Sequence, residues 1–212
     1  VCAAVLFDLK FGSMAARPDV AMGYAACEAA LQGNPIQEGN VGAGTGCTIG
    51  KIRGPQYAMK GGLGTCAYRQ GDLMVGAVMA CNAMGDVVED GTILAGARND
   101  DNTGFAGTEE WLIQHSQRQR DIFSGKLAGE NTVIGCVVTN AALNKAQAAK
   151  LAAVAQNGIA RAVRPANATF DGDSLFAMCH GTVPADPDAV GILAARAVEE
   201  AIRRGIRAAE TL

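Results

Sequence analysis

Short apolar runs separated by glycines and polar residues are the feature of this sequence that most limits its fold. Runs of strand length occupy residues 1–7, 47–52, 61–68, 73–82, 92–97, 132–139 and 174–179. These runs are mostly apolar, and glycines flank several of them, which is typical of strands in sheets buried on both faces. The sequence therefore predicts sheets that other layers cover.

Helical patterns lie before and after the central group of strands. Pro18 and Asp19 predict a helix start that continues to about residue 31, and a short helix is expected over residues 109–118. Apolar residues recur every three to four positions over residues 140–164, and Asp186 with Pro187 opens a last helix. Strands flanked by helices predict an α/β fold in which helices cover sheets.

Length and composition predict one globular domain over residues 1–212. The chain is 49% hydrophobic but only 5% aromatic, and it contains 27 glycines. Its core must therefore consist of small and aliphatic side chains in close contact.

Charge and cysteine content exclude several classes of function. A net charge of -3 provides no basic surface, so nucleic acid is not expected as a partner. The seven cysteines are an odd number without a Cys-x-x-Cys pair, which argues against a zinc or redox site and favours a reducing, cytoplasmic location. No apolar run is long enough to span a membrane, and no targeting segment is visible.

The chain begins at Val1, without a methionine, inside an apolar run. We therefore expect a strand already in progress at this point, with a segment upstream of it missing from the sequence.

Several motifs fail the tests for common sites. The Gly42-x-Gly44-x-Gly46 run lacks the spacing of a dinucleotide or phosphate loop, so tight turns explain it better. His115 and His180 are isolated, which predicts structural roles and no metal site. No Gly-x-Ser-x-Gly motif anchors a serine hydrolase.

Four polar positions remain candidates, each with an alternative. Lys51 lies among apolar residues and glycines, and it is either a functional lysine in a site or a solvated lysine at the end of a strand. Asn82 ends an apolar run, where it either ties down a turn or stabilises an oxyanion. Asp171 and Asp173 flank a glycine, and they are either carboxylates of a functional site or part of an ordinary turn.

Thr132 heads an apolar strand directly after the polar, glycine-containing connector 125–131. Its hydroxyl could attack the carbonyl of Asn131 and cleave the chain there. The new amino-terminal threonine would hold both a nucleophile and an α-amine able to act as general base. An ordinary threonine at the start of a strand is the alternative, and the local sequence alone favours it.

The region around Thr132 resembles the self-cleavage region of the P1 (S58) peptidase family, which includes aminopeptidase/D-esterases, β-peptidyl aminopeptidases and the nylon-oligomer hydrolase. The likeness covers nearly the whole chain, in order. The segments that carry it are residues 39–46, 60–64, 75–77, 82–86, 130–140, 158–165 and 170–177.

The resemblance implies a four-layer α/β/β/α sandwich that self-cleavage divides into residues 1–131 and 132–212. It also implies that Thr132 is the nucleophile, that Asn82 helps to stabilise the oxyanion, and that Lys51, Asp171 and Asp173 complete the site. No cofactor is implied, and a homo-oligomer of four or more chains is expected. Family members carry a further N-terminal segment that this sequence lacks.

The implied activity is hydrolysis of amide bonds in small peptides or peptide-like oligomers. Acyl transfer of the ornithine acetyltransferase type and an inactive oligomeric scaffold are the alternatives. The sequence does not separate α-peptide, β-peptide, D-residue or polyamide substrates.

Overall fold

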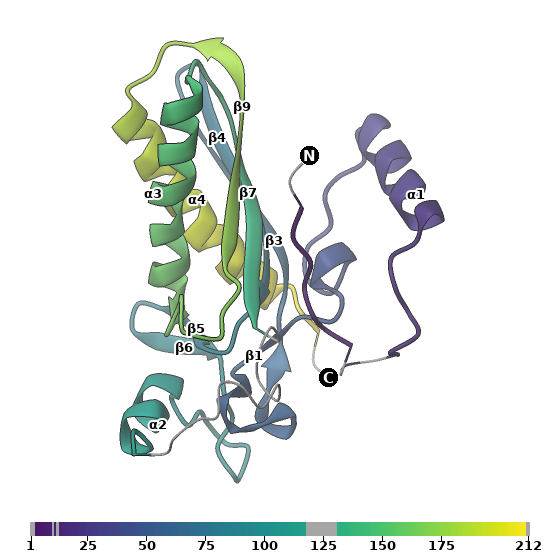
Figure 1. Cartoon of the computed structure of the whole chain (residues 1–212), viewed down its shortest axis with the longest axis vertical. Helices are drawn as coiled ribbons and strands as arrows, with labels where there is room; N and C mark the ends of the chain where they lie inside the picture. The colour runs from purple at the N-terminus through teal and green to yellow at the C-terminus, as the bar shows by residue number, and fades with distance from the viewer. Residues whose placement is uncertain (1–2, 10, 12, 118–130, 211–212) are drawn as a thin grey trace.

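The computed structural model describes residues 3–9, 11, 13–117 and 131–210, and its centre is a four-stranded sheet (Figure 1). The strands are β3 (Gly62–Gln70), β4 (Leu73–Asn82), β7 (Thr132–Ala141) and β9 (Ser174–Val183), in the spatial order β3-β4-β7-β9. The first three pair antiparallel with their neighbours, whereas β7 and β9 are parallel. The ends of β7 and β9 that come first in the chain therefore lie side by side.

Two long helices cover one face of this sheet (Figure 1). They are α3 (Lys145–Ala162), which connects β7 to β9, and α4 (Pro187–Arg207), which ends the described chain. Asn144 begins α3 with a reciprocal capping box to Gln147, and Asp186 caps α4. The helix starts follow from these caps, which are present in the sequence.

The core between the helices and the sheet is made of small and aliphatic side chains. The described residues of this hydrophobic cluster that are buried include no aromatic side chain. Gly64 shows how close the packing is, because a Cβ placed there would lie 1.9 Å from the backbone oxygen of Ala201 in α4. The composition-based prediction of a close-packed aliphatic core is therefore confirmed.

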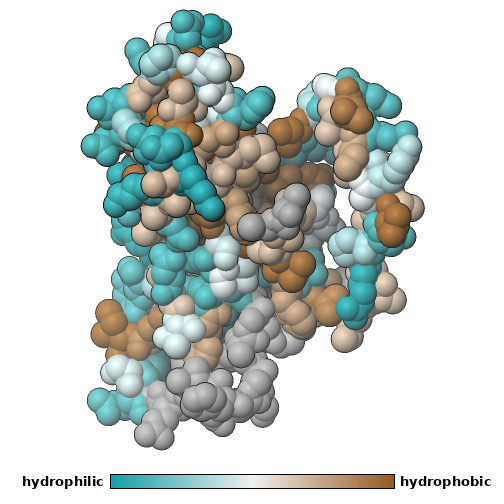
Figure 2. All heavy atoms as spheres, turned by 45° about the horizontal axis from the view of Figure 1, so that its top comes forward, coloured by the Kyte–Doolittle hydropathy of each residue, from teal (hydrophilic) through white to brown (hydrophobic). Residues whose placement is uncertain are grey.

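The other face of the sheet is apolar but more exposed. Met74, Val138 and Met178 are 51%, 43% and 58% exposed. Helix α1 (Val20–Leu31), which has no buried residue, stands on this side, apart from the sheet (Figure 1). In the space-filling view a hollow separates the segment that holds α1 from the rest of the molecule (Figure 2).

Smaller elements surround the end of the sheet at which β7 begins. Strands β6 (Thr92–Ala95), β5 (Asp86–Glu89) and β8 (Val163–Arg164) form a three-stranded sheet, and β1 (Thr48–Ile49) pairs with β2 (Met59–Lys60). The 3-10 turns are η1 (Gly42–Gly44), η2 (Lys51–Arg53) and η3 (Pro55–Tyr57), and α2 is Thr108–Gln114.

The α/β prediction is confirmed, but three local predictions were wrong. Residues 3–7 form no strand, because no described strand pairs with them. The helix expected from residue 140 begins at Lys145, because Asn140 still belongs to β7 and bonds through its side chain to the backbone of β4 and of the turn before it. The strand expected over residues 47–52 ends at Ile49, where Gly50 turns the chain into η2.

Strands β2, β5 and β8 were not predicted, since two to four residues carry little periodic signal. Most of the connector 125–131 lies outside the described residues. The helix expected over 109–118 is α2, which begins at Thr108 but already ends at Gln114, and residues 115–117 form a turn. No described helix has the length and apolar character needed to cross a membrane. Within the same ranges, no cluster of three or more potential metal-ligating side chains occurs.

Candidate active site

Thr132 and Asn82 lie opposite each other on neighbouring strands. Thr132 is the first residue of β7 and Asn82 the last residue of β4, and the antiparallel register pairs them directly. Both are buried, with 6% and 1% of their surface exposed. Because side chains at paired positions point to the same face of a sheet, this register brings the hydroxyl and the amide together.

The Asn82 side chain is fixed in one orientation by donors to its amide oxygen. Oδ1 accepts from the Thr48 backbone N–H at 3.0 Å, from the Thr48 hydroxyl at 3.3 Å and from Lys51 Nζ at 2.7 Å. With its oxygen held in this way, Asn82 must present Nδ2 as a donor elsewhere. Nδ2 donates to the backbone oxygen of Phe7 at 3.2 Å, so this amide is suited to binding a carbonyl oxygen.

Lys51 reaches Asn82 because the chain turns sharply before it. Gly50 has φ +70°, a conformation that favours glycine, and a Cβ there would lie 2.0 Å from the backbone nitrogen of Ala97. The turn directs Lys51 so that Nζ also donates to the Asn82 backbone oxygen at 2.8 Å. The ammonium group is thus anchored at the end of β4, beside the start of β7.

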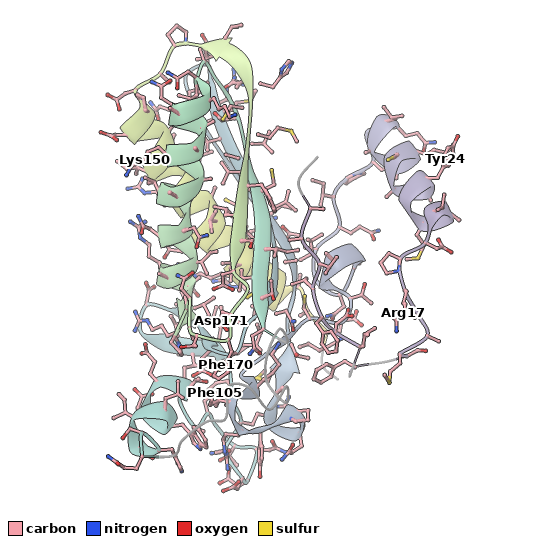
Figure 3. The ribbon with its side chains drawn as sticks, viewed as in Figure 1. Arg17, Tyr24, Phe105, Lys150, Phe170 and Asp171 are labelled. Atoms are coloured by element: carbon pink, nitrogen blue, oxygen red, sulfur yellow. The ribbon has the colours of Figure 1, made fainter. Side chains whose placement is uncertain are left out.

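The loop that leads into β9 lies on the other side of Thr132. Asn131 forms a parallel bridge with Asp171, and the Gly172 N–H donates to the Asn131 backbone oxygen at 2.9 Å. The Thr132 hydroxyl donates to the same oxygen at 2.6 Å. Figure 3 shows Asp171 at this end of the sheet, next to Phe170.

The two carboxylates of this loop have environments that hinder ionisation. Burial is the main cause that raises the pKa of Asp171 to about 6. The hydrogen bond from the Ala168 N–H lowers this pKa. The charge of Asp173 raises it further, and the charge of Lys51 lowers it. Asp171 Oδ1 is buried without a hydrogen-bond partner among the described atoms. Burial also raises the pKa of Asp173, although Oδ1 accepts from the Val133 N–H at 2.8 Å.

The structure brings together all the site residues that the sequence analysis singled out. Thr132, Asn131, Asn82, Lys51, Asp171 and Asp173 meet where β4 ends and β7 begins. A hydroxyl, an amide donor, an ammonium group and two carboxylates are a set suited to nucleophilic attack on a carbonyl carbon. Their assigned roles stay predictions.

Sequence reasoning missed two contributors, Thr48 and Gly172. Thr48 lies three positions before Lys51 in the same apolar run and carried no separate signal, because its part is to hold Asn82, 34 positions away. Gly172 acts through its backbone N–H, which any residue except proline carries. Its position between two aspartates was visible, but its bond to Asn131 was not.

His115 packs against Trp111 of α2, and its predicted structural role stays a prediction. Its ring stacks on Trp111 with centroids 4.0 Å apart, and its Nδ1 lies 2.7 Å from the Trp111 backbone oxygen.

Comparison with curated proteins finds relatives named as amide hydrolases. The chain is 36% identical to an uncharacterised aminopeptidase of Mycobacterium leprae (strain TN) over 191 residues, which are 86% of this chain and 49% of that protein. It is 29% identical to the 6-aminohexanoate-oligomer endohydrolase of Paenarthrobacter ureafaciens over 179 residues, covering 84% of this chain and 49% of that protein. The chain thus spans about half the length of these two relatives.

Solved structures show the same fold. The L-aminopeptidase D-Ala-esterase/amidase of Ochrobactrum anthropi, described as a variant of the Ntn hydrolase fold, superposes with a TM-score of 0.53 at 24% identity, over 84% of this chain and 46% of that chain. A β-aminopeptidase of Burkholderia sp. has the same score and identity over 83% and 48%. The predicted sandwich class is confirmed by these neighbours.

The sequence model of one family matches the whole length, residues 1–212, and its description is peptidase family S58. Together with the order of the strands and the residues gathered at the start of β7, this match shows that the chain belongs to peptidase family S58.

Proposed function

We propose that this chain carries the catalytic centre of an N-terminal-nucleophile amidohydrolase that cleaves itself between Asn131 and Thr132. The freed Thr132 then hydrolyses amide bonds of small peptides or peptide-like oligomers. The observation that carries the proposal is the position of Thr132, which begins β7 directly opposite Asn82, with its hydroxyl bonded to the carbonyl that it would attack. The names of the curated relatives favour hydrolysis over acyl transfer.

In the proposed reaction the α-amine of Thr132 takes the proton of its own hydroxyl. The Thr132 oxygen bonds to the substrate carbonyl carbon, and the negative charge that develops on the carbonyl oxygen is bound by Asn82 Nδ2. The carbon–nitrogen bond then breaks as the leaving amine takes up the proton. Water hydrolyses the resulting ester, releases the carboxylate and restores the threonine.

Lys51 and Thr48 act in this scheme through Asn82. Their bonds to Oδ1 determine which end of the amide faces the substrate. A donor that is already oriented needs no rearrangement when the oxyanion forms, which is the physical basis of this kind of stabilisation.

Asp171 and Asp173 hold the strand start and supply negative charge near the new amine. Asp173 binds the N–H of Val133, the residue after the nucleophile. Cleavage converts the neutral amide nitrogen of Thr132 into an amine that can be protonated, and a nearby carboxylate stabilises that positive charge.

The first test is the intact mass of the purified full-length protein under denaturing conditions. The proposal predicts two polypeptides that meet at Asn131/Thr132, and one uncut polypeptide for Thr132→Ala. Thr139→Ala is the matched control, because Thr139 is also buried in β7 but donates its hydroxyl to the Met74 backbone oxygen. The control should be cut like the parent protein. A parent protein that stays uncut would contradict the proposal.

The second test is the release of a free carboxylate from amino-acid and peptide amides with no acceptor added. Hydrolysis predicts release at a rate proportional to the amount of cut chain. A requirement for an added amino-acid acceptor would indicate acyl transfer instead. The cytoplasmic location and the homo-oligomer stay predictions, to be checked by cell fractionation and light scattering.

A further inference from the structure

The carbonyl group between Asn131 and Thr132 has a second hydrogen-bond donor besides the nucleophile. Its oxygen accepts the Gly172 N–H at 2.9 Å, in addition to the Thr132 hydroxyl at 2.6 Å. The Gly172 N–H therefore already binds the oxygen that would carry the negative charge, and a donor that is in place before the reaction can stabilise that charge.

The segment Asp171–Gly172–Asp173 lines up residue by residue with the peptide to be cut. Asp171 bridges Asn131, Gly172 binds the Asn131 oxygen, and Asp173 binds the Val133 N–H at 2.8 Å. The peptide on each side of Thr132 is therefore held by consecutive residues of one loop. This register fixes the carbonyl in place before any reaction begins.

The residue between the two aspartates lies against the nucleophile itself. A Cβ built at position 172 would lie 3.0 Å from Thr132 Oγ1, a tighter contact than nearly all real Cβ atoms make. Any side chain here would therefore require the hydroxyl to shift by a few tenths of an ångström. Glycine gives the hydroxyl room while keeping the N–H beside the carbonyl.

We infer that the Gly172 N–H is the oxyanion donor of the self-cleavage reaction, a different donor from the Asn82 amide that serves the amide substrate. The inference rests on the proposed self-cleavage. The Thr132 oxygen bonds to the Asn131 carbonyl carbon, and the carbonyl oxygen becomes the oxyanion that Gly172 binds. The bond from that carbon to the Thr132 nitrogen breaks, and the hydroxyl proton ends on that nitrogen. Water then hydrolyses the Asn131–Thr132 ester to a carboxylate and a hydroxyl.

Replacing one N–H by oxygen tests this directly. The full-length protein is made by cell-free translation with glycolic acid at position 172, which converts the N–H into an ester oxygen and leaves every side chain unchanged. The cut fraction is followed over time by intact mass, which distinguishes cleavage at 131/132 from hydrolysis of the new ester. Since the loss of one oxyanion donor costs about 10²–10³-fold in rate, self-cleavage should slow by at least about 100-fold.

Glycolic acid at position 61 is the matched control, because the Gly61 N–H also donates to one backbone oxygen, that of Cys47, at 2.8 Å. This protein loses a comparable hydrogen bond away from the scissile carbonyl and should self-cleave at close to the parent rate. Thermal melting curves of both ester proteins, each carrying Thr132→Ala so that it stays uncut, identify a temperature at which both are folded. The cleavage rates are compared at that temperature.

Gly172→Ala provides a second variant that keeps the N–H and adds only the Cβ. It measures what crowding of the Thr132 hydroxyl costs by itself, because the added Cβ would lie 3.0 Å from Thr132 Oγ1. Equal rates for the 172 ester and the parent protein would overturn the inference while leaving the proposed function intact. An uncut parent protein, in contrast, would contradict the proposed function itself.

Discussion

Asn82 is held by more hydrogen bonds than the end of a strand requires. Its amide oxygen accepts three donors from the segment 48–51, and Lys51 also binds its backbone oxygen. A buried amide with a satisfied oxygen can turn only by breaking these bonds, each of which contributes about 0.5–1.5 kcal/mol, or more from a charged donor. At the residue scale, the site is therefore organised around the orientation of one side chain.

Lys51→Met should lower the turnover of an amide substrate by about 100-fold per cut chain, in the range seen when an oxyanion donor is lost. The expected loss is in kcat rather than KM, because Lys51 acts through Asn82 on the transition state in the proposed reaction. Lys60→Met is the control, since Lys60 donates to the Thr45 backbone oxygen and is not bonded to Asn82. Equal losses in both variants would show a general effect of removing a lysine.

Asp171 should make the uncut chain less stable as the pH rises through 6. Burial raises the pKa of Asp171 to about 6 in the folded chain, whereas the unfolded carboxyl titrates near pH 4. Between about pH 4 and pH 6 the folded state therefore binds a proton that the unfolded state has lost, and the free energy of unfolding falls as the pH rises through this range. Asp171→Asn in a Thr132→Ala chain should remove this dependence. The gain in melting temperature from Asp171→Asn should therefore be larger at pH 7.5 than at pH 4.5, and an equal gain at both would refute the assignment.

At the element scale, the turn from β1 into η2 determines where Lys51 points. Gly50 has a positive φ, and backbone atoms of Gly96 and Ala97 already occupy the place that a Cβ would take. The turn between β3 and β4 offers a contrast, because Gly71 also has a positive φ, but a Cβ placed there would meet no atom within 4 Å. Substitutions at these two glycines therefore distinguish the effect of backbone strain alone from the effect of displacing the site.

Gly71→Ala should cost about 1–2 kcal/mol of unfolding free energy through the left-handed backbone alone, and leave turnover unchanged. Gly50→Ala should cost more, since the Cβ would lie 2.0 Å from the Ala97 nitrogen, and it should also lower turnover by moving η2. Urea denaturation and amide hydrolysis, measured on both variants, test the pair. Retained turnover in Gly50→Ala would show that η2 does not depend on this turn.

The sequence was sufficient to predict the long elements and the residues at their ends. The run 73–82 was predicted with the bounds of β4, and Asp19 and Asp186 cap helices close to their expected starts. Two of the wrong predictions have a common cause: whether residues 3–7 and 140–144 form a regular element depends on partners far away in the chain. Asn140, for instance, remains in β7 because it binds Asp72 and Met74.

The site was predictable in its members but not in its contacts. Thr132, Asn82, Lys51 and the two aspartates were recognisable by residue type and resemblance. Their mutual orientation depends on the β4–β7 register and on Gly172, whose backbone N–H has no signature in a sequence. Thr48 escaped notice because its bonds are to a residue 34 positions later.

At the scale of the whole molecule, the site rests on the packing of α3 and α4 against the sheet. Ile159 in α3 is fully buried in this layer, whereas Ile192 in α4 is 52% exposed. Most of the stability of long helices in proteins comes from such packing rather than from helix propensity. The two isoleucines therefore differ in what their removal costs.

Ile159→Ala should lower the free energy of unfolding by about 2–5 kcal/mol, because it leaves a cavity in a packed core. Ile192→Ala, the matched control, should change it by less than about 1 kcal/mol, since surface substitutions are nearly neutral. Denaturant unfolding of both variants in the Thr132→Ala chain measures the difference. Similar losses would indicate that the α3 layer is loosely packed.

The pairing of β4 with β7 has a consequence for the chain if it is cut before Thr132 as proposed. One piece then contributes β3 and β4 to the sheet, and the other contributes β7, β9 and both covering helices. Unfolding of the uncut chain is a unimolecular event, but unfolding of the cut chain is also a dissociation, so its midpoint depends on protein concentration. Maturation would thus make refolding a bimolecular encounter, and a protein that has once come apart in dilute solution would rarely reassemble.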